Sequence, residues 1–366
     1  MSAARRRGYL DWLRGVAVLI MIQAHLLDSW TRFPDRESVA FAWAMTVGGM
    51  GAPMFLFLAG VAVPLSAGSK LRRGADARGA ARAVVRRGLE IFGLALLFRL
   101  QAWVLGWSSP RALLKVDILN IMGPSIMAAA AFWGAARTTA ARFVLFLAAT
   151  IAMGFVTPIV RSLPFVMALP DPIQAYIRPV PYLSNFVFFP WAGFVFGGAL
   201  VGLVLDAVFT PDRERRANIW FAIVGLAVAV IAFVSSYFPS WHPASSFWTT
   251  SPAFFFLRLA LLTLTVPAAY LWERRPGGAG KWSPFRQLGR TSLFIYWIHV
   301  EMVYGLISRP WHKGLSWTQA WIALAIFAAF MLACSIAKDR AVEWWKRRSL
   351  DTHRDPGIDS GGASGR

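Results

Sequence analysis

Charged residues are few in this chain and cysteine is nearly absent, and both shortages exclude whole classes of protein. Only 15% of the 366 residues are charged, whereas 57% are hydrophobic, so a soluble globular domain is excluded. Cys334 is the single cysteine, so no intramolecular disulfide can form and no cysteine-based metal site is expected. Acidic residues are the scarcer kind, 18 against 38 basic ones, which gives a net charge of +20.

Several catalytic signatures are also missing. The sequence contains no GxSxG, Walker A, GxGxxG or HExxH motif. His242, His312 and His353 lie in predicted loops and in the tail without clustered carboxylates, so no metal is expected. We see no internal repeat, which argues against a transporter built from two related halves.

What the chain has in excess is long apolar segments. Ten of them approach the roughly 20 residues that a helix needs to cross a bilayer. They cover residues 10–28, 46–67, 88–106, 117–134, 143–160, 186–206, 218–238, 253–271, 291–308 and 320–338. The pattern predicts an all-α, polytopic membrane bundle over residues 10–340. A basic N-terminus, 1–9, would precede it, and a polar, disordered tail, 341–366, would follow it.

The basic residues lie in short runs between these segments, which indicates membrane topology and not binding to nucleic acid. One set of loops, with both termini, carries 27 Lys and Arg, and the other set carries 8. The imbalance places both termini in the cytoplasm of a multi-pass protein of the inner cell membrane. The first apolar run is long and lacks a cleavage site, so we interpret it as a span and not as a removed signal peptide.

Arg14 and His25 are the most unusual residues of the first span, because ionisable groups at membrane depth are costly. Their spacing of eleven residues is about three turns plus roughly 20°, so both share one helix face, roughly 16 Å apart along the axis. His25 could be a structural hydrogen-bonding group or a general base for an acceptor hydroxyl or amine. Arg14 could snorkel to the surface or bind a phosphate group, with Asp11 orienting it from three residues before.

A basic cytoplasmic patch follows the second span. It includes Lys70, Arg72, Arg73 and Arg86. Such runs often fix topology or bind anionic lipid, and this one would also attract a phosphate-rich cytosolic donor.

Two further spans hold intramembrane polar candidates. In the third, Glu90 and Arg99 face opposite sides of one helix, so Glu90 can reach Arg86 and Arg99 needs a partner elsewhere. The fourth opens with Asp117 as a possible N-cap and Asn120 three residues later.

The ninth span holds a second polar cluster, with Tyr296 three residues before His299 and Glu301 two residues after it. His299 and Glu301 lie about 200° apart around the helix, so only one of them can face a given cavity. Structural roles stay open for both.

Five segments together resemble the transmembrane acyltransferase superfamily. They are, in order, LDWLRGVAVLIMIQAH, GAPMFLFLAG, VDILNIMG, FPWAGFVFGG and LGRTSLFIYWIHVEMVYG. Within it the chain is most similar to bacterial proteins with a heparan-alpha-glucosaminide N-acetyltransferase catalytic domain. The Arg14–His25 spacing also resembles the signature of the acyltransferase-3 branch. The resemblance covers roughly residues 8–340.

The resemblance implies transfer of an acyl group, usually acetyl, from cytosolic acyl-CoA to a glycan or other acceptor across the membrane. It implies that His25 acts as the base or acyl-handling residue, that Arg14 contacts the donor, and that His299 is a recurring histidine of the late span. The lysosomal glucosaminide enzyme has its catalytic histidine in the loop after the first span. The matching loop here, residues 29–45, has none, which moves the prediction to His25.

Two other hypotheses stay open on the sequence. A small-solute transporter or channel could use His25, Arg99, His299 and Glu301 along its route. A non-catalytic scaffold would bind no CoA and would tolerate substitution of Arg14 and His25. The identity of the acceptor and the oligomeric state do not follow from the sequence.

Overall fold

The computed structural model describes residues 7–106, 109–275 and 282–352. These residues form helices and two isolated β-bridges, which confirms the predicted all-α membrane bundle. Eight helical segments are long and apolar enough to cross a membrane. They are α1 (Gly8–Trp30), α3 (Val39–Gly48) with α4 (Gly51–Arg72), α6 (Ile118–Ala135), α7 (Thr139–Ser162), α10 (Phe188–Ala207), α11 (Pro211–Ser235), α12 (Pro252–Glu273) and α15 (Trp317–Thr352).

The two remaining predicted spans take other forms. Residues 88–106 lie in α5 (Ala77–Gly106), a 30-residue helix whose first turns carry arginines. The span predicted at 291–308 is shorter than expected, because α14 (Ser292–Tyr304) ends at an extended Gly305. Thr291 separates it from α13 (Pro284–Arg290), and its hydroxyl donates to the Gln287 carbonyl, a local bond that competes with regular helix.

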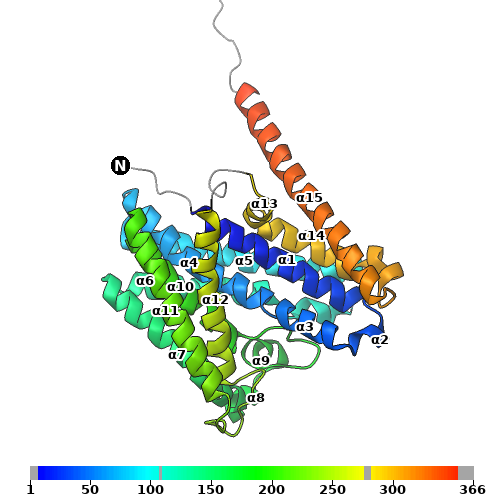
Figure 1. The fold of residues 1–366 in the computed structure, drawn as a ribbon, viewed down its shortest axis with the longest axis horizontal. Helices are drawn as coiled ribbons and strands as arrows, with labels where there is room; N and C mark the ends of the chain where they lie inside the picture. The colour runs from blue at the N-terminus through cyan, green and yellow to red at the C-terminus, as the bar shows by residue number, and fades with distance from the viewer. Residues whose placement is uncertain (1–6, 107–108, 276–281, 353–366) are drawn as a thin grey trace, which may run out of the picture.

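Short helices occupy the connections. They are α2 (Phe33–Arg36), η1 (Pro110–Leu114), α8 (Pro164–Met167), α9 (Asp171–Ile177) and η2 (Leu306–Trp311). α15 projects beyond the other helices (Figure 1) and continues to Thr352. Residues 341–352 of the predicted disordered tail are therefore helical, since Ala, Glu, Lys and Arg favour helix. Residues 353–366 lie outside the described part.

Glycines allow the central helices to approach each other closely. A Cβ at Gly60 of α4 would overlap the backbone carbonyl of Val195 in α10, and one at Gly198 of α10 would overlap that of Phe57. α1 packs against α13 in the same way, because a Cβ at Gly289 would meet the Asp11 carbonyl. Small residues give such contacts in membranes, where apolar burial drives association little. α1 also contacts α3, α4, α12, α14 and α15, so its polar face lies inside the bundle.

Candidate active site

A cavity of about 2850 Å³ extends along the inward face of α1. Its lining includes Arg14 near the start of α1, then Met21, His25 and Asp28 toward the end. Much of the remaining wall comes from α3, α4, α5, α6, α10, α12 and α14, with further residues from α13 and α15. The two residues that the sequence placed on one helix face therefore line one continuous space.

His25 forms a pair with His299 of α14. The His25 Nδ1 and His299 Nε2 atoms are 2.9 Å apart, and the two ring planes lie within 2° of parallel. His299 is fully buried, and its Nδ1 lies 2.8 Å from the carbonyl oxygen of Ile295. A carbonyl can only accept, so His299 Nδ1 carries the proton and donates to Ile295. His299 Nε2 then accepts from His25 Nδ1–H, which leaves the lone pair on His25 Nε2.

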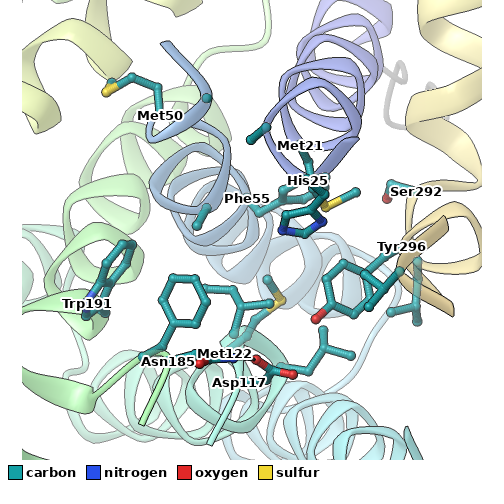
Figure 2. A pocket seen from close by; sticks show the side chains of 18 of the residues that line it. Met21, His25, Met50, Phe55, Asp117, Met122, Asn185, Trp191, Ser292 and Tyr296 are labelled. Carbon is teal, nitrogen blue, oxygen red and sulfur yellow. Dashed lines mark hydrogen bonds between the residues drawn. The ribbon is translucent and has the colours of Figure 1, made fainter. Parts of the chain in front are cut away.

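The cavity surrounds this histidine with polar and aromatic side chains. Figure 2 shows His25 pointing from α1 into a space bounded by Tyr296 and Asp117. The ring of Tyr304 contacts His25 edge-on, with centroids 5.6 Å apart. The Tyr304 hydroxyl donates to Asp28 Oδ2 at 3.5 Å, and Asp28 also pairs with Arg36 at 2.8 Å. Asp28 and Tyr304 were not predicted from the sequence, although Asp28 follows His25 by three residues on the same helix face.

The sequence predicted that Arg99 needs a partner outside its own helix, and the structure contains one. Arg99 forms an ion pair with Asp117, which begins α6 as an N-cap in a capping box with Asn120. Both side chains of the ion pair line the cavity and are largely buried. Asn185 donates its Nδ2 to Asp117 Oδ1 at 2.8 Å, which joins the loop before α10 to the same group.

Asn120 lies behind this wall and not in it. Its Nδ2 donates to the hydroxyl of Tyr176 in α9 at 3.3 Å. Burial raises the pKa of the Tyr176 phenol, so this hydroxyl stays protonated near neutral pH. The Asn120 side chain therefore holds the start of α6 and α9 together.

The other end of the cavity is basic. Arg14 pairs with Asp11 at 3.1 Å, as the i,i+3 spacing predicts. Arg87, Arg290 and Lys338 line the same end, although they come from three different elements. Arg290 has no acidic group within ion-pair distance among the described residues. Arg87 belongs to the basic patch that follows the second span, whereas the sequence did not single out Arg290 and Lys338, because their helices meet α5 only in the fold.

Most of the predicted basic patch lies apart from this cavity. Arg87 is in the cavity lining, but Lys70, Arg72, Arg73 and Arg86 are absent from it. Arg72 pairs with Asp206 at 2.8 Å, and Arg73 donates to Ser69. Arg86 lies 3.7 Å from Glu90, so the predicted i,i+4 pair forms on the exposed surface of α5. Lys70 is in the last turn of α4.

The polar cluster of α14 divides as helical geometry requires. Tyr296 and Glu301 line the cavity, whereas His299 lies behind the lining against His25. Trp297 donates to Gln101 of α5 at 2.7 Å, which fixes α14 against that helix. Across the described ranges, no three His, Cys, Asp or Glu side chains gather as a metal site would need.

The family is shown by a comparison with family models. The model described as heparan-alpha-glucosaminide N-acetyltransferase, catalytic, matches residues 6–238, which is well over half of the chain. The protein therefore belongs to this family of membrane acetyltransferases and is a multi-pass membrane acyltransferase. The match includes Arg14, His25 and Asp117 and ends before α14, which carries His299. No curated protein matches the chain.

Proposed function

We propose that this protein transfers an acyl group, usually acetyl, from cytosolic acyl-CoA to a glycan or other acceptor on the extracytoplasmic side of the inner membrane. The observation that carries the proposal is the single cavity that joins Arg14 to His25 along α1. A group delivered at the basic end can reach the histidine without leaving the protein. An acceptor can approach the same histidine from the opposite end of the cavity.

The basic end of the cavity fits a phosphate-rich donor. Arg14, Arg87, Arg290 and Lys338 converge there, and guanidinium groups bind phosphate with paired, charge-assisted hydrogen bonds. When bound, acyl-CoA supplies the activated thioester. The apolar residues between the basic end and His25, among them Met21 and Phe55, would line the channel for its pantetheine arm.

His25 has the geometry of a general base. Its Nδ1–H is held by His299, so Nε2 faces the cavity with a lone pair that can take a proton from an acceptor hydroxyl or amine. When His25 gains that proton, its Nδ1–H becomes a stronger donor to His299 Nε2. We therefore assign His25 as the catalytic residue and His299 as a residue that positions it.

Loss of the positioning bond should slow the chemical step and spare donor binding. We expect His299→Ala to lower kcat about tenfold to a hundredfold, with little change in KM for acetyl-CoA, because His25 can then rotate or change tautomer. His299→Gln should recover part of the loss, since its amide oxygen can accept from His25 Nδ1–H. The pH profile of kcat should shift in His299→Ala, which a merely structural role would not cause. His312→Gln, in an outer loop, is the control and should behave as wild type.

Substitutions at the basic end of the cavity, where acyl-CoA would bind, test the proposed function directly. Arg290→Gln and Arg87→Gln should each weaken acetyl-CoA binding about tenfold or more, because a charge-assisted hydrogen bond is worth about 1.5–3 kcal/mol. Arg86→Gln removes the same charge one residue away, from a side chain that also pairs with Glu90 but does not line the cavity, and should change binding less than twofold. Binding isotherms and KM values for acetyl-CoA measure both effects. An equal or larger effect of Arg86→Gln would place the donor on the surface patch instead.

A further inference from the structure

A second, smaller cavity of about 220 Å³ adjoins the main one on the side predicted to be extracytoplasmic. The two cavities share Asn185, Trp191, Trp248, Phe254 and Arg258 in their walls. The small cavity lies where α7 ends and α12 begins, which is far along the chain from the basic residues at the donor end. It is therefore a side chamber of the route to His25.

Two arginines line this side chamber, and both bind backbone carbonyls instead of acids. Arg161, in the last turn of α7, donates from Nε to the carbonyl oxygen of Phe189 at 3.0 Å. Arg258, in the second turn of α12, donates to the carbonyl oxygen of Gly49. Within the described ranges of the chain, no carboxylate lies within 4.0 Å of either guanidinium.

Arg161 and Arg258 thus differ from those arginines of the bundle that are paired with acids. Arg99, Arg72 and Arg36 each have a carboxylate partner. A guanidinium carries five N–H donors, so Arg161 and Arg258 keep donors and full charge available toward the chamber. Backbone carbonyls stabilise both charges in part, and a bound anion would add the counter-charge that both side chains lack.

Aromatic rings surround the same arginines. The Arg258 guanidinium lies 5.4 Å from the ring centroid of Trp191, 5.6 Å from that of Phe194 and 5.0 Å from that of Phe254. These rings fix the orientation of the side chain. Trp248, 68% exposed, offers an open ring face beside them. A ligand that fits this chamber has an anionic group for the arginines and a flat apolar face for the tryptophan.

We propose that Arg161 and Arg258 form a subsite for the anionic group of the acceptor, a carboxylate attached to a sugar ring. The proposal rests on the proposed function, since it defines the acceptor class of the same cavity. Figure 2 shows Trp191 across the cavity from His25 and Tyr296. An acceptor anchored in the side chamber therefore extends its other end into the space that His25 faces. The subsite selects acidic acceptors over neutral ones.

The test is equilibrium binding of radiolabelled glucuronate and glucose to the purified full-length protein without any acyl donor. Wild type should bind glucuronate at least tenfold more tightly than glucose, and Arg258→Gln and Arg161→Gln should each lose most of that preference. Arg142→Gln is the matched control. Arg142 also lies over a ring, 3.7 Å from the Trp133 centroid, and donates to backbone carbonyls, but it lines neither cavity. It should keep the preference, and all variants should bind acetyl-CoA as wild type does.

Equal binding of the two sugars by wild type, or a preference that survives in both variants, would overturn the proposal. A third arm adds short-chain phosphatidylglycerol as a competitor. Binding of this lipid that depends on Arg258, together with no preference for glucuronate, would assign the arginines to a lipid headgroup and also overturn it. Because no acyl transfer is measured, a failure of the proposed reaction would leave this binding result unchanged, and the two failures can be told apart.

Discussion

Replacing His25 with alanine should reduce acceptor-dependent acetyl transfer by about 10²–10⁴-fold, the usual contribution of a positioned general base. The reason is geometric, since His25 Nε2 is the free basic atom of a histidine pair that faces the shared cavity. Acetyl-CoA binding should change little, because the basic residues at the other end of the cavity are untouched. Steady-state rates with purified protein, together with an acetyl-CoA binding isotherm, separate the two effects.

His242→Ala is the matched control for this experiment. His242 lies between α11 and α12, lines neither cavity and accepts a hydrogen bond from the Ala244 backbone. We expect its removal to leave the rate within twofold of wild type. If His25→Ala transferred acetyl at the wild-type rate, His25 would not be the general base. No other residue of this chain would then be assigned that role.

The second large effect concerns stability. Asp117→Ala should lower the free energy of unfolding by about 3–5 kcal/mol, because it leaves the buried Arg99 guanidinium without its counter-charge. The same change removes the N-cap of α6 and the acceptor of the Asn185 hydrogen bond. Reversible unfolding in mixed micelles, followed by circular dichroism, measures the loss.

Two controls separate the buried charge from other causes. The double variant Arg99→Met, Asp117→Leu removes both charges and should be clearly more stable than Asp117→Ala, since no unpaired ion remains. Glu90→Gln breaks the half-exposed pairs of Glu90 with Arg86 and Arg87 on α5 and should cost less than about 1 kcal/mol. If Asp117→Ala were as stable as Glu90→Gln, the Arg99–Asp117 pair would not hold this part of the bundle together.

Local periodicity was sufficient to predict much of the fold and part of the site. The common face of Arg14 and His25, the Asp11–Arg14 pair, the Asp117 cap and the Glu90–Arg86 pair all depend on helical spacing within one segment. Each is therefore readable from residues less than twelve positions apart. The need of Arg99 for a distant partner was also predictable, because a charge inside a membrane helix must be compensated.

Contacts between distant segments could not be predicted in the same way. The His25–His299 bond joins residues 274 positions apart, and only the packing of α14 against α1 brings them together. The break at Thr291 depends on a hydroxyl that bonds Gln287 and Ser335, and α15 supplies the latter. The donor end was predicted on the basic patch, but of that patch the cavity lining includes Arg87, and Arg290 and Lys338 come from α13 and α15. A charge count along the chain finds basic residues but not the cavity that they share.

The proposed function requires that one protein takes an acyl group on one side of the membrane and delivers it on the other through the cavity of His25. Sealed vesicles that contain the purified protein, with labelled acetyl-CoA outside and a mixture of glucosamine and glucuronate-bearing amino sugars inside, test it most directly. We expect labelled acetyl-sugar inside the vesicles with wild type and almost none with His25→Ala. Acetylated product only outside, equal product with His25→Ala, or release of the trapped sugars without acetyl-CoA would contradict transfer across the membrane by His25.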